Sequence, residues 1–321
     1  MRAAKSNSND APLEKSVWRK LQFPIVIAVV FWAIAIALWQ RTGRAFFLFD
    51  IGYIGTSLGV GIGLFALLPR RNRPIGRRLA QFLVGVYMVG FLGFLVQQNM
   101  QLEGLFFIFC TGIFAGAIIH YSIAKLFGPL LFGRGFCGWA CWTAMVLDLL
   151  PYTRSRGRLP GGWDRIRHLH FAVSLLLVAS LVFLFGVRSA DYEPVYWMAA
   201  GNLFYYLAGI ALAFALKDNR AFCKYACPVP VLMKIGSRFS LMKIGGDAGR
   251  CDRCGACEKA CPMDIRITDY IHAGKRVLST ECILCQTCVS VCPTQALADS
   301  CGIDAGGREL LRLNAAGGAR Q

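Results

Sequence analysis

The stretches CDRCGACEKACP (251–262) and CILCQTCVSVCP (282–293) carry one cysteine spacing twice, Cys-x2-Cys-x2-Cys-x3-Cys-Pro. With this spacing a short loop wraps three thiolates around one [4Fe–4S] cube and sends its fourth cysteine to a neighbouring cube. Zinc sites and disulfide frameworks do not require the third cysteine or the Cys-Pro ending. The repeat therefore predicts a two-cluster ferredoxin region in a chain that transfers electrons.

The crossed ligation of two-cluster ferredoxins assigns the eight cysteines to two sets. The first [4Fe–4S] cluster is predicted to bind Cys251, Cys254, Cys257 and Cys292, and the second to bind Cys261, Cys282, Cys285 and Cys288. Between the motifs, residues 265–270 and 276–278 flank Ala273-Gly274 and predict a short β-hairpin. We expect a small βαβ-duplicated domain around the two cubes.

The rest of the chain is strongly apolar. Of 321 residues, 56% are hydrophobic and only 17% are charged, which is unusual for a soluble protein of this size. Six apolar runs approach the ~20 residues that cross the hydrocarbon of a membrane. The predicted fold is thus an α-helical bundle of about six transmembrane helices, the first an uncleaved anchor, followed by a C-terminal α+β ferredoxin domain. The six runs are 23–39, 46–68, 79–96, 105–124, 171–187 and 195–216.

The distribution of basic residues predicts the orientation. The N-terminal arm and segments 69–78 and 154–167 carry five Lys or Arg each, whereas loops 97–104 and 188–194 are poor in them. By the positive-inside rule both termini and all the cysteine motifs are cytoplasmic, at the inner membrane of a bacterium or archaeon. The net charge of +17 therefore indicates topology, and no nucleic-acid partner is expected.

A second cysteine phrase also occurs twice, as GRGFCGWACW (133–142) and NRAFCKYACP (219–228). Both copies read Arg-x-Phe-Cys-x2-Ala-Cys. Because residues i and i+4 share one face of a helix, each pair is expected to point its thiols the same way. We predict a third [4Fe–4S] cluster or another metal centre; redox-active disulfides within each pair, or structural cysteines, are the alternatives. Its ligands would be Cys137, Cys141, Cys223 and Cys227.

These features give a domain plan. A cytoplasmic arm (1–22) precedes a transmembrane domain (23–216) that contains the cytoplasmic Cys-x3-Cys loop (133–167). The second Cys-x3-Cys segment and a linker (217–245), the ferredoxin domain (246–300) and a flexible tail (301–321) follow.

Over roughly residues 80–300 the chain resembles the NapH/NosR-type membrane polyferredoxins. Their mark is two cytoplasmic Cys-x3-Cys-Pro motifs on a small membrane bundle, followed by a pair of [4Fe–4S] motifs. The first copy departs from it, since Trp142 stands where the family has proline. The resemblance implies oxidation of a membrane quinol and delivery of electrons to a partner reductase, as the electron-transfer subunit of a quinol dehydrogenase.

Intramembrane ionisable residues are candidates for a quinol site, because burying them is costly. His120, near the inner end of the fourth run, is the candidate proton acceptor, since a neutral imidazole can take a proton from a quinol hydroxyl. A helix–helix hydrogen bond is the alternative. His168 and His170 could join it in a haem site, but no haem-binding phrase is present, and haem is not expected. The other ionisable residues are Asp50, Glu103, Lys125 and Asp148.

Two other functions fit the same cysteines. One is an assembly or maturation factor that reduces a metal or a disulfide for another redox enzyme. The other is a redox-sensing regulator. The motifs encode neither the direction of electron flow nor the cluster potentials.

Overall fold

The computed structural model describes residues 13–112, 116–187, 193–304 and 306–314. The chain divides into two compact units, one ending at Val84 and one beginning at Gly85. Five helices within the described ranges are long and apolar enough to cross a membrane, so this is a multi-pass membrane protein with a mostly helical fold. They are Lys20–Thr42, Ala45–Leu67, Arg73–Leu95, Trp163–Phe183 and Pro194–Leu216.

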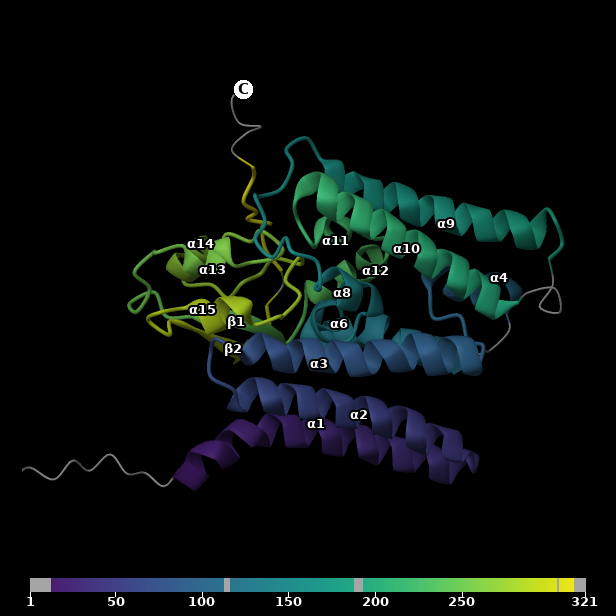
Figure 1. Ribbon diagram of the computed structural model, residues 1–321, viewed down its shortest axis with the longest axis horizontal. Helices are drawn as coiled ribbons and strands as arrows, with labels where there is room; N and C mark the ends of the chain where they lie inside the picture. Colours follow the sequence, from purple (N-terminus) through teal and green to yellow (C-terminus); the bar gives the residue numbers. More distant parts are fainter. Residues whose placement is uncertain (1–12, 113–115, 188–192, 305, 315–321) are drawn as a thin grey trace, which may run out of the picture. The chain divides into compact units, whose positions relative to one another are not determined.

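The first unit is built on close helix packing. Helix α1 (Leu13–Thr42) turns at Gly43 and packs along α2 (Ala45–Leu67) (Figure 1). A Cβ at Gly55 would lie 2.3 Å from Cβ of Phe31, and a Cβ at Gly61 would lie 2.4 Å from Cβ of Ala80 in α3 (Arg73–Val86). Small residues at these contacts let the backbones approach, which is how membrane helices associate.

The second unit joins the remaining membrane helices to the cysteine motifs. Helix α3 continues as the π-helix η1 (Tyr87–Leu95). Helices α9 (Ile166–Phe183) and α10 (Pro194–Leu216) lead away from the ferredoxin region, and His170 of α9 contacts the rings of Phe204 and Tyr205 in α10 (Figure 1). Short helices connect these parts: α7 (Gly135–Trp139), α8 (Trp142–Leu147), η3 (Trp163–Arg165), α11 (Ala221–Tyr225) and α12 (Val229–Ser237).

The fourth predicted span, 105–124, is not one helix. Helix α4 (Leu102–Thr111) ends at Gly112, whose φ of +70° is left-handed. Its ten residues rise about 15 Å, half of the ~30 Å hydrocarbon core. The chain resumes in α5 (Gly116–Tyr121), η2 (Ser122–Phe127) and α6 (Gly128–Phe132). Hydropathy counted apolar residues across a break that Gly112 imposes, so the prediction of a single span here was wrong.

Contacts show that residues 97–111 fold back beside the later helices. The Nζ of Lys125 donates to the carbonyl of Met100 at 3.1 Å, whereas a straight helix would separate these residues by about 37 Å. The non-helical stretch before α4 is buried at Asn99, Met100 and Gln101. Irregular backbone is tolerated at membrane depth only where protein or a cavity surrounds it, and this buried stretch meets that condition. We refer to residues 97–111 as the re-entrant segment.

In the ferredoxin region the strand before the cysteine motifs pairs with the strand after them. Strand β1 (Met242–Gly246) pairs antiparallel with β2 (Leu297–Cys301), with Met242 opposite Cys301. Helices α13 (Ala256–Lys259), α14 (Ile267–His272) and α15 (Thr287–Val291) lie between them. The region thus begins four residues before the predicted boundary at 246.

The β-hairpin predicted between the two cysteine motifs was wrong, because α14 occupies that position. Its buried residues are Ile267, Tyr270 and Ile271, the i, i+3, i+4 pattern of a helix face. Within residues 265–278, Ile265 alone makes an isolated β-bridge, with Leu311.

The segment after β2 differs from the flexible tail that was predicted. The amide of Arg312 donates to the carbonyl of Asp264 at 2.7 Å, and the amide of Arg158 donates to the carbonyl of Arg312 at 2.9 Å. The amide of Asn314 donates to the carbonyl of Arg158 at 2.8 Å. This part of the tail ties the 133–167 loop to the ferredoxin region; residues 315–321 lie outside the described ones.

Candidate metal centres

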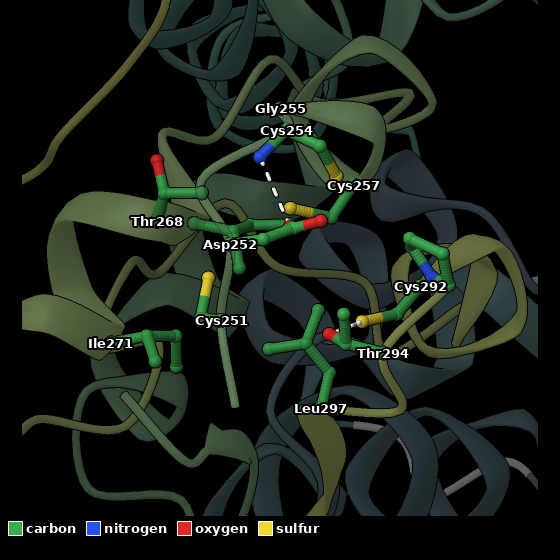
Figure 2. A pocket seen from close by; sticks show the side chains of 12 residues that line it. Cys251, Asp252, Cys254, Gly255, Cys257, Thr268, Ile271, Cys292, Thr294 and Leu297 are labelled. Atoms are coloured by element: carbon green, nitrogen blue, oxygen red, sulfur yellow. Dashed lines mark hydrogen bonds between the residues drawn. The ribbon is translucent and has the colours of Figure 1, made fainter. Parts of the chain in front are cut away.

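Four cysteines line a first cavity in the ferredoxin region: Cys251, Cys254, Cys257 and Cys292. Figure 2 shows the thiols of Cys251 and Cys292 pointing into this space from different sides. Cys254 is exposed, so this cavity lies at the protein surface. These are the cysteines that the sequence assigned to one cluster.

The other ferredoxin cysteines line a second cavity: Cys261, Cys282, Cys285 and Cys288. Cys261 belongs to the first motif, and the other three belong to the second. The fold thus groups the thiols across the motifs, as crossed ligation requires. Either set could hold a [4Fe–4S] cluster; the ligand assignment stays a prediction.

The two ferredoxin motifs share backbone strain as well as spacing. Three left-handed positions recur 31 residues apart. A non-glycine residue in this conformation costs roughly 1–2 kcal/mol, so repeated strain points to a functional constraint. Such turns let a short loop curl around its own centre. The pairs are Arg253 and Leu284, Gly255 and Gln286, and Asp264 and Gln295.

The four remaining paired cysteines line a third cavity: Cys137, Cys141, Cys223 and Cys227. The amide of Cys141 donates to the carbonyl of Phe136 at 3.0 Å, and the amide of Cys227 donates to that of Phe222 at 2.9 Å. Both phrases therefore adopt one turn, although Trp142 replaces proline in the first. The turn is not the continuous helix that was expected, since α7 ends at Trp139 and Cys141 is extended.

The arginine of each phrase is buried at this third cavity. Arg134 pairs with Glu281 at 2.7 Å, and Arg220 pairs with Asp148 at 2.6 Å. Arg220 also donates to the carbonyl of Cys137 at 3.2 Å. Nε and Nη2 of Arg134 and Nε of Arg220 are buried and have no hydrogen-bond partner within the described ranges. Unsatisfied guanidinium donors beside four thiols fit an anionic group such as a thiolate-bound cluster.

Glu281, next to Cys282, is the centre of a buried ion cluster. Four cations surround its one carboxylate, which leaves three positive charges in excess. Burial alone would raise the pKa of Glu281, but these cations hold it well below its ordinary value. The cations are Arg134 at 2.7 Å, Arg158 and Arg167 at 2.9 Å, and Lys234 at 2.5 Å.

Sequence reasoning missed this cluster and a second one. In the sequence Arg158 and Arg167 stand out only as positive charges of a loop, yet both are buried against Glu281. Lys224, inside the second phrase, is fully buried and pairs with Asp218 at 2.6 Å and with Asp264. No motif spacing links Lys224 to Asp218 or Asp264. The one signal in the sequence is that a lysine stands between two motif cysteines, where it could be expected to be buried and to need an anionic partner.

The structure does not place His120 at the third cavity. His120 is buried, and its Nδ1 lies 3.3 Å from the carbonyl of Gly116. Lys125 lines the cavity instead. Nδ1 of His170 lies 2.8 Å from the carbonyl of Ala226, at the second turn. Among the described residues, no three His, Cys, Asp or Glu side chains gather tightly enough to hold a single metal ion, in the ferredoxin region or at the third cavity.

Three cysteine-lined cavities on a membrane-helix bundle define a ferredoxin-type electron transport protein, and comparison with known families agrees. The family model of the 4Fe-4S dicluster domain matches residues 243–293. A model of a 4Fe-4S binding domain matches residues 106–159 and 203–246, which contain both Cys-x3-Cys phrases. The chain therefore binds iron–sulfur clusters.

Curated relatives give the same family. The chain is 34% identical over 190 residues to an uncharacterised protein of Methanocaldococcus jannaschii, covering 57% of this chain and 71% of that protein. It is 30% identical over 180 residues to the methylamine utilization ferredoxin-type protein MauN of Paracoccus denitrificans, covering 52% of this chain and 62% of the relative.

The ferredoxin-type protein NapH of Haemophilus influenzae is 25% identical over 201 residues, covering 59% of this chain and 70% of that protein. No solved structure matches. The chain belongs to the NapH-type membrane polyferredoxins.

Proposed function

We propose that this protein carries electrons from a membrane quinol, through three iron–sulfur centres on the cytoplasmic side, to a partner reductase. Each cluster, when bound, exchanges single electrons with its neighbours. Oxidation of one quinol to quinone releases two electrons and two protons, so the chain must offer consecutive one-electron sites. The observation that supports a relay is the direct packing of the Cys137–Cys141 turn on the second ferredoxin loop.

This packing is tight at two adjacent residues. The indole Nε1 of Trp139 donates to the carbonyl of Leu284 at 2.9 Å. A Cβ at Gly138 would lie 2.2 Å from the carbonyl oxygen of Ile283, so only glycine fits there. Cys137 shares one hydrophobic core with Cys285. The third cavity is thus contiguous with the Cys282–Cys285 loop through protein atoms.

The contact favours an order for the relay. Electrons would enter at the Cys137/Cys141/Cys223/Cys227 centre, pass to the cluster of the second cavity, and leave by the first. Cys254, at the first cavity, is exposed, whereas Cys285 and Cys288 at the second cavity are buried. A partner reductase could therefore approach the first cluster most closely.

The cytoplasmic orientation is part of this proposal. The orientation requires a sixth crossing besides the five long helices. The shorter apolar stretch Ile118–Phe132, which follows the re-entrant segment, would supply it in place of the predicted fourth span. Arg154, Arg156 and Arg165 remain as positive charges of the 133–167 loop, since Arg158 and Arg167 pair with Glu281.

The test uses the full chain, purified in detergent with its clusters. A menaquinol or ubiquinol analogue should reduce the oxidised protein, seen as loss of visible absorbance and appearance of cluster signals in electron paramagnetic resonance. The control is the double variant Cys137→Ser, Cys223→Ser. It should hold about eight iron atoms in place of about twelve, and dithionite but not quinol should reduce it.

Two results would count against the proposal. If no quinol analogue reduces the wild type, the donor is wrong. If quinol reduces the double variant as fast as the wild type, electrons do not enter at the third centre.

A further inference from the structure

Beside the four thiols, the third cavity carries buried polar atoms without partners. Both side-chain amide atoms of Gln101 are unpaired within the described part of the chain, as is the hydroxyl of Tyr205, and both residues line the cavity. Three residues beyond the lining also carry buried atoms without a partner in the described ranges: the hydroxyl of Tyr121, Oε2 of Glu103 and Nδ2 of Asn202. Native proteins rarely leave such atoms unsatisfied, so a group of them indicates a bound ligand or water.

Several contacts gather these side chains around Lys125, which also lines the cavity. The Nζ of Lys125 lies 4.0 Å from the ring centroid of Tyr121 and 4.8 Å from that of Trp142. The Nε1 of Trp142 donates to Oδ1 of Asn202 at 2.9 Å, which fixes the amide whose Nδ2 is unpaired.

Glu103 is held in the same way, with one oxygen satisfied. Its Oε1 accepts from the hydroxyl of Ser174 at 2.8 Å, while its Oε2 is left over. The carboxylate also lies near enough to Lys125 and Tyr121 to interact electrostatically with both.

The re-entrant segment explains how Gln101 reaches the cavity. Met100 is anchored by the Nζ of Lys125, and the next residue, Gln101, is 3% exposed. A continuous fourth span would have carried these residues far from Cys137 and Cys141. The fold-back therefore brings an amide with two free hydrogen-bonding atoms to the side of the thiols.

We propose that this polar end of the third cavity binds the headgroup of a membrane quinol, an inference that rests on the proposed function. The headgroup is a flat ring with an oxygen at each end. The Oε1 of Gln101 and Oε2 of Glu103 can accept from quinol hydroxyls, and the Nε2 of Gln101 and the hydroxyl of Tyr205 can donate to quinone carbonyls. The aromatic side chains of Phe136 and Trp142 line the same space and offer apolar faces to the ring.

The site differs from the one expected from sequence. Gln101, Lys125 and Tyr205 line the cavity together with the four cysteines, and His120 does not. In this arrangement the quinol ring and the third centre share one cavity, so no further carrier is needed between them.

Binding is tested with a short-chain quinone on the full chain in nanodiscs, with its clusters in place. The variants are Gln101→Leu and Tyr205→Phe, and the matched control is Gln98→Leu. Gln98 belongs to the same segment but packs against Gly116 and does not line the cavity. Dissociation constants are measured by calorimetry, and a photoreactive quinone is used to map the cross-linked peptides. Iron per protein and the cluster spectrum report on folding.

We expect Gln101→Leu and Tyr205→Phe each to weaken quinone binding about five- to tenfold, the effect of one lost hydrogen bond, with iron unchanged. The cross-link should map to peptides that contain residues 98–105 or 198–208. Gln98→Leu should bind as the wild type does.

The outcomes separate the two proposals. If the wild type binds quinone and both variants bind it equally well, the site is wrong and the atoms hold water only, while the proposed function stands. If the wild type binds no quinone, the donor itself fails. If Gln101→Leu loses iron, Tyr205→Phe decides, because it removes a single oxygen atom.

Discussion

The ferredoxin cavities and the third cavity bring their cysteine thiols together in different ways. Each ferredoxin motif curls its own loop with left-handed residues, so three thiols meet within seven residues of chain. The third cavity draws its two turns from positions 86 residues apart, and each turn is held by a buried guanidinium paired with a carboxylate. The ferredoxin sites are therefore local backbone structures, whereas the third site depends on tertiary ion pairs.

The largest effect should come from removing the carboxylate on which the ion pairs depend. Glu281→Gln would leave Arg134, Arg158 and Arg167 buried without their anion. Breaking a buried pair by removing one partner typically costs about 3–5 kcal/mol. We expect a loss of that size in the free energy of unfolding of the second unit, measured by urea denaturation in detergent micelles.

The matched control is Asp269→Asn, whose pair with Arg266 is exposed at 2.5 Å. Such surface pairs contribute about 0–1 kcal/mol. Equal losses from the two variants would show that the cluster around Glu281 contributes no more than a surface pair.

The same carboxylate predicts a pH dependence. Because folding lowers the pKa of Glu281, its contribution is fully present above its unfolded pKa of about 4.3 and declines as the pH falls through the lowered value. The difference in unfolding free energy between wild type and Glu281→Gln should be constant from pH 6 to pH 8. A difference that varies across that range would mean that another group is responsible.

The link between the two kinds of site can be broken at one glycine. Gly138→Ala would place a methyl group 2.2 Å from the carbonyl oxygen of Ile283, so the Cys137–Cys141 turn must move away from the second ferredoxin loop. We expect a loss of about 1–3 kcal/mol in stability and slower reduction of the ferredoxin clusters by quinol, followed by stopped-flow absorbance.

Gly135→Ala is the control in the same turn. Its nearest contact would be Cβ of Phe132 at 3.2 Å, which requires a shift of only a few tenths of an ångström. If quinol reduces the ferredoxin clusters of Gly138→Ala and Gly135→Ala as fast as those of the wild type, the contact between Gly138 and Ile283 is not needed for electron transfer.

The comparison also shows which parts of the fold the sequence could predict. The two ferredoxin sets could be predicted from spacing, because each motif supplies three cysteines from one short loop and its fourth to the other set. The repeated Arg-x-Phe-Cys phrase predicted which four cysteines form the third set. It did not predict the role of its arginines, because their partners Glu281 and Asp148 come from other parts of the chain. The sequence did not predict the re-entrant segment, because hydropathy averages over the break at Gly112. It did not predict α14, because two short apolar stretches beside Ala273-Gly274 resemble a hairpin.

The smallest effect should be a test of the local strain itself. Gly255 has a φ of +69°, and a Cβ there would meet nothing within 4 Å. Gly255→Ala would therefore cost only the left-handed conformation, about 1 kcal/mol of unfolding free energy, without a steric clash. Gly90→Ala adds the same methyl group in equally open space at an ordinary φ, and it should be neutral. Because Gln286 already occupies the equivalent position of the second motif, the variant should still bind its iron. Loss of iron from the Gly255→Ala protein would mean that glycine is needed at the first cluster for close approach and not for its backbone conformation.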